Sequence, residues 1–218
     1  SGHSAPSATV VSTSGERSAL WASYEALHNV RRLEHGTRWM LQLRVVAKRS
    51  GPNKQPKSRI QGHHMRLTHA SDLHGRYKML EDVEGEDFDA WCITGDFFPN
   101  KPRNLGSSEG EAAYQLHWWE HKSASVLRRL GNKPAITVDG NHDFVSLGAL
   151  LQRARPGMVH RIRPSGLDFM GVRFAGFPNI PYIAGYWNHE SGKDVLSALC
   201  YEVFEEGDPE VLVTHCPP

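Results

Sequence analysis

Short apolar runs alternate with amphipathic segments over the last two thirds of the chain. Apolar runs of this length are typical of buried β-strands. Five of them are present, at 65–70, 89–94, 134–138, 171–177 and 210–215. Helical spacing of apolar residues lies between them, at about 75–84, 110–130, 144–154 and 193–206. Repetition of strand and helix predicts an α/β fold with a central sheet that is covered on both faces.

The pattern before residue 65 is different. Apolar residues from Ser18 to Val46 recur at roughly helical spacing, which predicts one or two amphipathic helices. Residues 1–17 are rich in Ser, Ala and Gly, and we expect them to be disordered. Residues 44–64 contain six basic residues and no acidic residue. Gly51, Pro52 and Pro56 interrupt regular secondary structure there, and the segment is interpreted as a linker.

Charge divides the chain at the same point, although the net charge is only +1. Residues 1–64 carry ten basic and three acidic residues, whereas residues 65–218 carry fifteen basic and twenty-one acidic residues. We therefore expect two units: a basic, partly disordered or helical extension with a linker over 1–64, and a compact domain over 65–218. The basic linker could contact nucleic acid, with a solvated tether as the competing interpretation.

Composition limits the classes of protein to consider. No stretch approaches the roughly 18 apolar residues of a membrane-spanning helix, so no contact with a membrane is predicted. The first residues lack the apolar segment of a secretory signal, and we expect a cytoplasmic protein. Cys92, Cys200 and Cys216 are few and lack the spacing of a metal clip, which fits a reducing compartment without disulfides.

Residues that can bind metal follow four of the predicted strands. Asp72 and His74 follow the first strand, Asp96 the second, Asn141 the third and His215 the last. The carboxyl ends of strands in an open α/β sheet meet at one edge, so we expect these side chains to lie together. Each of them alone could be a helix cap or a turn residue. Their order at successive strand ends favours a shared metal site.

The segments that contain these residues are SDLHG, GDFF, GNHD and THCPP, and together they resemble the motifs of the calcineurin-like metallophosphoesterases. The resemblance implies layered, sandwich-like sheets flanked by helices, and a centre of two divalent metal ions. It also implies that Asp72 and His74 bind the first metal, that Asp96 bridges the two, and that Asn141 and His215 bind the second. Such oxygen and nitrogen ligands suit Mn, Fe or Zn without selecting one of them.

The resemblance also implies a reaction, the hydrolysis of a phosphoester. Two divalent ions about 3.5–4 Å apart neutralise phosphoryl oxygens and lower the pKa of a water between them. In the resembling family the histidine of GNHD faces the substrate, so His142 is expected to protonate the leaving oxygen or to hold a phosphoryl oxygen. Asp143 is expected to pair with the imidazole of His142 and to fix its tautomer. The preferred substrate is a small-molecule or nucleotide phosphodiester.

Residues 176–190 form a loop-like segment with two prolines and several aromatic residues. Such a segment could make one wall of a substrate pocket, in which Tyr182 or His189 contacts the substrate. Packing is the competing role for both side chains.

The family pattern normally continues with a GHxH segment, which gives one more ligand to each metal. This chain ends three residues after His215, so we expect its sequence to be a piece of a longer protein. If Pro218 were the true end, the alternative would be a non-catalytic binding or regulatory module.

Two other activities compete with this interpretation. GDFFPNKPRN resembles the second motif of DNA-repair nucleases of the same superfamily, and the basic linker would suit such a nuclease. HWWEH, which contains His117 and His121 one helical turn apart, matches the HxxEH pattern of inverted zinc peptidases. The alternative for HWWEH is a surface helix whose tryptophans pack inward.

Overall fold

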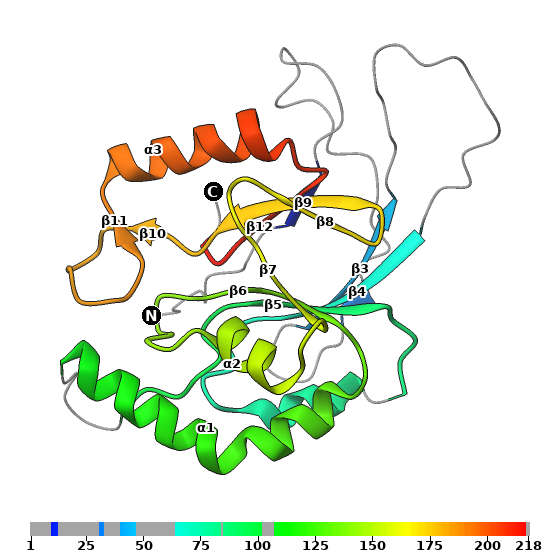
Figure 1. Cartoon of the computed structure of the whole chain (residues 1–218), viewed down its shortest axis with the longest axis vertical. Coiled ribbons are helices and arrows are strands. Elements are labelled where there is room, and N and C mark those ends of the chain that lie inside the picture. Colours follow the sequence, from blue (N-terminus) through cyan, green and yellow to red (C-terminus); the bar gives the residue numbers. More distant parts are fainter. Residues whose placement is uncertain are drawn as a thin grey trace.

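Two β-sheets pack face to face in the computed structural model of the chain, with helices on their outer sides (Figure 1). The structure describes residues 10–12, 31–32, 40–46, 64–83, 85–101 and 107–216. In Figure 1 the sheets lie between helix α1 below and helix α3 above. The layers follow the order helices, six-stranded sheet, four-stranded sheet, helix.

The larger sheet has the strand order β2-β3-β4-β5-β6-β7. Strands β4 to β7 are parallel to one another. Strand β3 pairs antiparallel with β4, and β2 pairs antiparallel with β3. The bounds are β2 Arg31–Arg32, β3 Met40–Val46, β4 His64–Ala70, β5 Ala90–Thr94, β6 Ala135–Val138 and β7 Val159–Arg161.

The smaller sheet has the strand order β1-β12-β9-β8. Strands β12 and β9 are parallel, and the outer strands β1 and β8 run antiparallel to them. The bounds are β1 Val10–Ser12, β8 Leu167–Phe169, β9 Val172–Phe177 and β12 Val211–Thr214. A separate parallel pair consists of β10 Ile180–Pro181 and β11 Glu190–Ser191.

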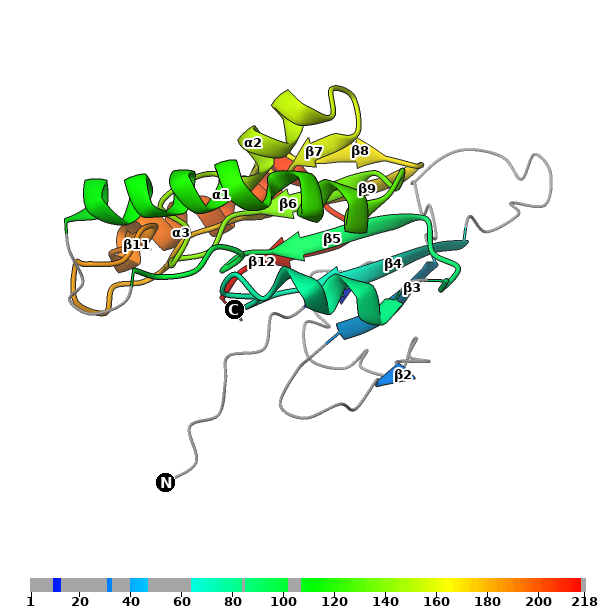
Figure 2. The same cartoon turned by 90° about the horizontal axis from the view of Figure 1, so that it is seen from below.

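Helices cover the outer faces of both sheets. The six-stranded sheet is covered by the 3-10 helix η1 Tyr77–Val83 and by the α-helices α1 Ser108–Leu130 and α2 Leu147–Ala154. In Figure 2, which views the molecule from this side, α1 and η1 lie in front of the strands. Helix α3 Lys193–Glu202 continues into the π-helix η2 Val203–Gly207, and both pack on β9 and β12.

Strand β5 shows why the apolar runs are continuous and not alternating. Trp91 and Ile93 point to the helices and belong to the core on that side, whereas Ala90 and Cys92 point to the second sheet. Successive side chains of a strand face opposite sides of the sheet, so a strand buried on both faces is apolar at every position. The burial of all five residues of β5 follows from its place in the middle of the layers.

The five strands and the α-helices expected after residue 65 are confirmed, as is the fold class of layered sheets flanked by helices. The larger sheet is covered on both faces, as expected, by helices on one face and by a second sheet on the other. The strands 171–177 and 210–215 form the core of a second sheet, and this sheet covers one face of the first. The segment 75–84 forms a 3-10 helix in place of an α-helix.

Two predictions before residue 64 are corrected. The helices expected between Ser18 and Val46 do not extend over Arg31–Arg32 or Met40–Val46, which are strands. The sequence MLQLRVV also fits a period of two, and pairing with β4 over seven residues stabilises the strand form. Val10–Ser12, expected to be disordered, pair with β12. The rest of the predicted extension and most of the linker lie outside the described residues, and the division at residue 64 stays a prediction.

No helix within the described ranges is long and apolar enough to cross a membrane.

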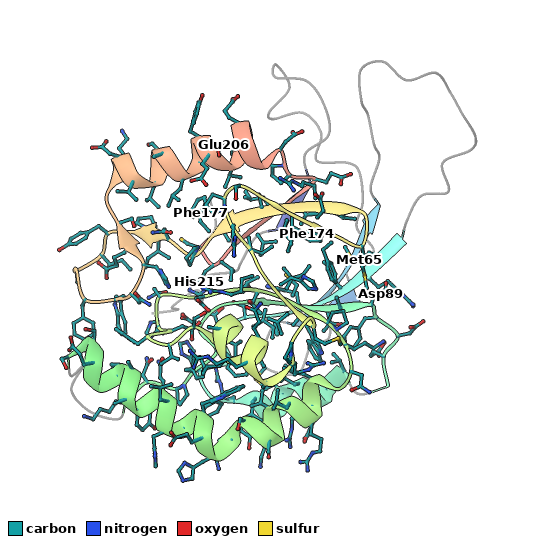
Figure 3. The ribbon with its side chains drawn as sticks, viewed as in Figure 1. Met65, Asp89, Phe174, Phe177, Glu206 and His215 are labelled. Carbon is teal, nitrogen blue, oxygen red and sulfur yellow. The ribbon has the colours of Figure 1, made fainter. Side chains whose placement is uncertain are left out.

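Phe174 gives a test of the core between the sheets, because its side chain is fully buried there (Figure 3). We expect Phe174→Ala to lower the free energy of unfolding by about 3–5 kcal/mol, through lost burial and the cavity that remains. Phe204→Ala is the matched control, since Phe204 is 48% exposed and should cost about 1 kcal/mol or less. Chemical denaturation of both variants measures the difference, and equal losses would contradict the assignment of this core.

Candidate metal centre

The loops after β4, β5, β6 and β12 meet at one edge of the layered sheets. Asp72 and His74 follow β4, Asp96 follows β5, Asn141 follows β6 and His215 follows β12. Figure 3 shows His215 at the opposite end of the sheets from Asp89, which directly precedes β5. The structure thus brings together the five residues that the sequence predicted as metal ligands.

Asp96 lies at the centre of this group and is 3% exposed. Its Oδ2 is 3.6 Å from Nε2 of His74, and its Oδ1 is 3.4 Å from Nε2 of His215. Possible ligand atoms gather within 4.8 Å of one another in two sets, one of His74, Asp96 and His142 and one of Asp72, Asp96 and His215. Asp96 is common to both sets, which is the position that a bridging carboxylate needs. The distribution of the other ligands between two metals stays a prediction.

The loops after β4 and β5 hold three of the predicted metal ligands in an unusual backbone conformation. Asp72, His74 and Asp96 all have positive φ angles, of 56°, 44° and 52°. This region costs most residues about 1–2 kcal/mol relative to a right-handed conformation. Two hydrogen bonds between the loops offset the cost, from the Asp72 N–H to the Gly95 carbonyl (3.1 Å) and from the His74 N–H to the Asp96 carbonyl (2.8 Å).

Gly95 and Gly140 allow the loops to approach closely. A Cβ atom at Gly95 would lie 2.5 Å from the Cα atom of Gly140 and 2.6 Å from Nδ1 of His215. A Cβ atom at Gly140 would lie 2.2 Å from Oδ1 of Asp96. No side chain fits at either position without moving the ligands, which explains the glycine that precedes Asp96 and the glycine that precedes Asn141.

The hydrogen bonds of His215 indicate what the site binds. Its Nδ1 is 2.7 Å from the carbonyl oxygen of Thr94, so Nδ1 carries the proton and Nε2 presents a lone pair. That lone pair faces Oδ1 of Asn141 at 3.0 Å and Oδ1 of Asp96 at 3.4 Å. Three atoms that can each offer an electron pair thus face one another, and a cation among them could be bound by all three. The donor set therefore fits a divalent metal such as Mn, Fe or Zn.

Burial shifts the pKa values of Asp96 and His142 toward the uncharged forms of these side chains. Burial raises the pKa of Asp96 to about 7, the hydrogen bond from the His142 N–H opposes this, and the carboxylate of Asp72 raises the pKa further. Burial lowers the pKa of His142 to about 4, and His74 and His215 act in the same direction. A bound cation favours an ionised carboxylate and neutral imidazoles, which are the forms that bind metal.

Asp143 makes contacts that were not expected, because both carboxylate oxygens accept backbone N–H groups. Its pairing with the imidazole of His142 stays a prediction. Oδ1 accepts from Phe97 (2.9 Å) and Phe98 (3.1 Å), and Oδ2 accepts from Gly140 (2.9 Å). Burial raises the pKa of Asp143 to about 7, although the N–H donors act against this. Asp143 therefore ties the loop after β5 to the loop after β6.

The side chain of Asn100 is hydrogen-bonded to the imidazole of His142. Its Nδ2 lies 2.6 Å from Nδ1 of His142. An amide nitrogen donates and does not accept, so Nδ1 accepts this hydrogen bond and the proton of the neutral ring lies on Nε2. Sequence reasoning missed Asn100, although it belongs to the GDFFPN segment that had been singled out.

Gln115 on α1 is a second residue that the sequence did not reveal. Its buried amide donates from Nε2 to the carbonyl of His142 (2.7 Å) and accepts at Oε1 from the N–H groups of Phe144 (2.8 Å) and Val145 (3.2 Å). Helix α1 thereby holds the backbone around His142. A glutamine in a 23-residue amphipathic helix gives no sequence signal for such a role.

The segment 176–190 reaches the site through residues other than those predicted. Tyr182 is 65% exposed, and half-buried His189 contacts Asn188 with its Nε2 3.2 Å from Nδ2. The indole of Trp187 instead packs on the imidazole of His142, with ring centroids 3.9 Å apart. The contact of Tyr182 or His189 with a substrate stays a prediction.

The HxxEH segment lies apart from these loops on the exposed face of α1. Possible ligand atoms of His117, Glu120 and His121 lie within 4.8 Å of one another, and all three residues are exposed. Trp118 and Trp119 point the other way and pack on the phenylalanines that follow β5. The interpretation as a surface helix with inward tryptophans is confirmed.

Comparison with known protein families matches residues 65–218 to the family described as calcineurin-like phosphoesterase. No curated protein matches the chain.

Asp143→Asn tests whether this carboxylate ties the two loops. The amide nitrogen of asparagine would face N–H donors, so at least one buried donor loses its acceptor, which costs about 1–3 kcal/mol of unfolding free energy. Asp168→Asn is the control, because the Asp168 side chain is 76% exposed in its ion pair with Arg173 and should cost about 1 kcal/mol or less. Denaturation curves measure both variants, and an Asp143→Asn protein as stable as the control would refute the assignment.

Proposed function

The chain belongs to the calcineurin-like phosphoesterase family, and on that basis we propose that it hydrolyses phosphodiesters of small molecules or nucleotides with two divalent metal ions. Family membership supports metal-dependent phosphoester hydrolysis in general. The observation that carries the proposal is the position of Asp96, which is shared by two sets of possible ligands. Asp72, His74, Asn141 and His215 would hold the ions on either side of it.

The preference for a diester over a monoester concerns charge. A phosphomonoester carries a charge of about −1.5 to −2 at neutral pH, whereas a diester carries −1. Arg76, the cationic side chain that follows His74, donates to the backbone carbonyls of Leu73 and Asp72. A guanidinium engaged in this way suits the single charge of a diester.

When bound, the metals would neutralise the charge of the phosphoryl oxygens and would lower the pKa of a bound water. The other chemical requirement is a proton for the departing alkoxide. His142 would meet it from Nε2, the nitrogen that the Asn100 contact leaves protonated, and the ring would regain a proton from the attacking water. Trp187 packs against the same ring and limits the directions in which the imidazole can turn.

Hydrolysis after removal and return of metal is the test of the proposal. We expect the protein treated with chelator to be inactive, and Mn²⁺, Fe²⁺ or Zn²⁺ to restore cleavage of bis(p-nitrophenyl) phosphate. Cleavage of p-nitrophenyl phosphate should be slower. Asp96→Asn should lose both bound metal and activity, because the bridging carboxylate is removed. Full activity of wild-type protein without metal would contradict the proposal, and cleavage of DNA with steep salt dependence would favour the nuclease.

His142→Ala separates proton transfer from metal binding. We expect turnover to fall by roughly 10²–10⁴ on a diester with an alkyl leaving group, because the alkoxide then lacks its proton donor. The loss should be smaller on a p-nitrophenyl ester, whose leaving group needs no proton. Metal content, measured by atomic spectroscopy, should equal that of the wild type. Loss of metal in this variant would show that His142 is a ligand.

A further inference from the structure

The carboxylate of Glu190 organises the loop of residues 183–187, which belongs to the segment 176–190. Its Oε2 accepts N–H groups from Ile183 (3.1 Å), Ala184 (3.1 Å) and Gly185 (2.5 Å), and its Oε1 accepts the N–H of Trp187 (3.0 Å). Four backbone amides of one short segment thus converge on a single side chain. A carboxylate that accepts several N–H groups forms charge-assisted hydrogen bonds, which are stronger than neutral ones.

The base of the loop is fixed by the paired strands β10 and β11. The N–H of Ile180 donates to the carbonyl of His189 (3.0 Å), and the N–H of Tyr182 donates to the carbonyl of Ser191 (3.0 Å). The side chain of Ile180 is buried, which anchors this base in the domain. The conformation of the loop between the strands therefore depends mainly on the bonds to Glu190.

The far side of the loop contacts the residues around His142. The indole of Trp187 lies on the imidazole of His142, with ring planes inclined by 33°. The backbone N–H of Asn188 donates to the carbonyl of Asn141 (3.0 Å), and its Nδ2 donates to the carbonyl of Asp143 (2.7 Å). The loop therefore holds the backbone on both sides of His142 as well as the face of its ring.

We propose that Glu190 is a positioning residue for the reaction: its carboxylate folds residues 183–187 so that Trp187 and Asn188 hold His142 in place to protonate the leaving group. The inference rests on the proposed function of His142. Glu190 acts through the loop: the bonds of its carboxylate run to the backbone of Ile183, Ala184, Gly185 and Trp187.

Glu190 keeps its charge over the range in which the enzyme would be assayed. Desolvation acts to raise its pKa, but the four backbone N–H donors together outweigh it and lower the pKa to about 2. The acceptor is therefore an ionised carboxylate at every pH of interest. Replacement by the neutral glutamine of the same shape removes the charge and directs an amide N–H₂ group at backbone donors.

Glu190→Gln is the decisive variant. We expect kcat for an alkyl diester to fall about 10- to 100-fold, the range typical for residues that orient another functional side chain. The fall on a p-nitrophenyl ester should be much smaller, because its leaving group needs no proton. Metal content should be unchanged. Glu206→Gln on the exposed turn of η2 is the matched control for loss of one negative charge, and it should retain wild-type kinetics on both esters.

A double-mutant cycle identifies the path of the effect. Trp187→Ala should show the same dependence on the leaving group. Glu190→Gln should have a smaller effect in the Trp187→Ala background than in the wild type, because part of its effect passes through the contact of Trp187 with His142. Independent, multiplying effects would overturn the proposal. Equal losses of Glu190→Gln on the alkyl and p-nitrophenyl esters would overturn it as well, since a general loss of structure affects both substrates.

Amide hydrogen exchange tests the loop without reference to activity. In Glu190→Gln the amides of residues 183–187 should exchange faster, while those of β5 and β6 should stay protected. Unchanged exchange would overturn the role of Glu190. If exchange changes as expected but the wild type hydrolyses no phosphoester, the proposed function fails and the structural part of the inference stands.

Discussion

The contact between the backbone at Gly95 and Gly140 is the constraint on which the site depends. Each glycine leaves the space that a Cβ atom would fill, and the carboxylate of Asp96 and the imidazole of His215 occupy the surroundings. The distances among the possible ligands are therefore set by how closely two loops approach. Asp143 also holds the two loops together, because its carboxylate accepts N–H groups from both of them. The positions of the possible ligands are thus determined mainly by contacts of the backbone between the two loops.

Much of the fold and the ligand set could be predicted from the sequence, for a physical reason. A strand that is buried on both faces is apolar at nearly every position, as at residues 90–93, and such runs can be recognised in the sequence. Polar residues directly after these runs, such as Asp96 and Asn141, lie at the edge of the sheet where the strands end. The order of the runs was therefore enough to predict which residues meet, including His215 at the end of the last strand.

The remaining features depend on contacts that leave no local pattern. Which sheet a strand joins is decided by its partner, so the place of β9 and β12 in a second sheet was not predicted. Met40–Val46 fits both a helical and a strand period, and only its pairing with β4 distinguishes them. Asn100, Gln115 and Trp187 surround His142 from three separate segments, and each is of a residue type that is common in loops and helices without such a role.

The origin of His215 has a consequence for folding. Asp72, Asp96 and Asn141 follow strands of the six-stranded sheet, whereas His215 follows β12 of the four-stranded sheet. An ion held by both groups would be a cross-link between the two sheets. Separation of the sheets and release of the ion would then be a single thermodynamic event, so that the melting temperature of the domain would rise with the concentration of free metal. The cell's supply of metal would in this way set the lifetime of the fold as well as the rate of its chemistry.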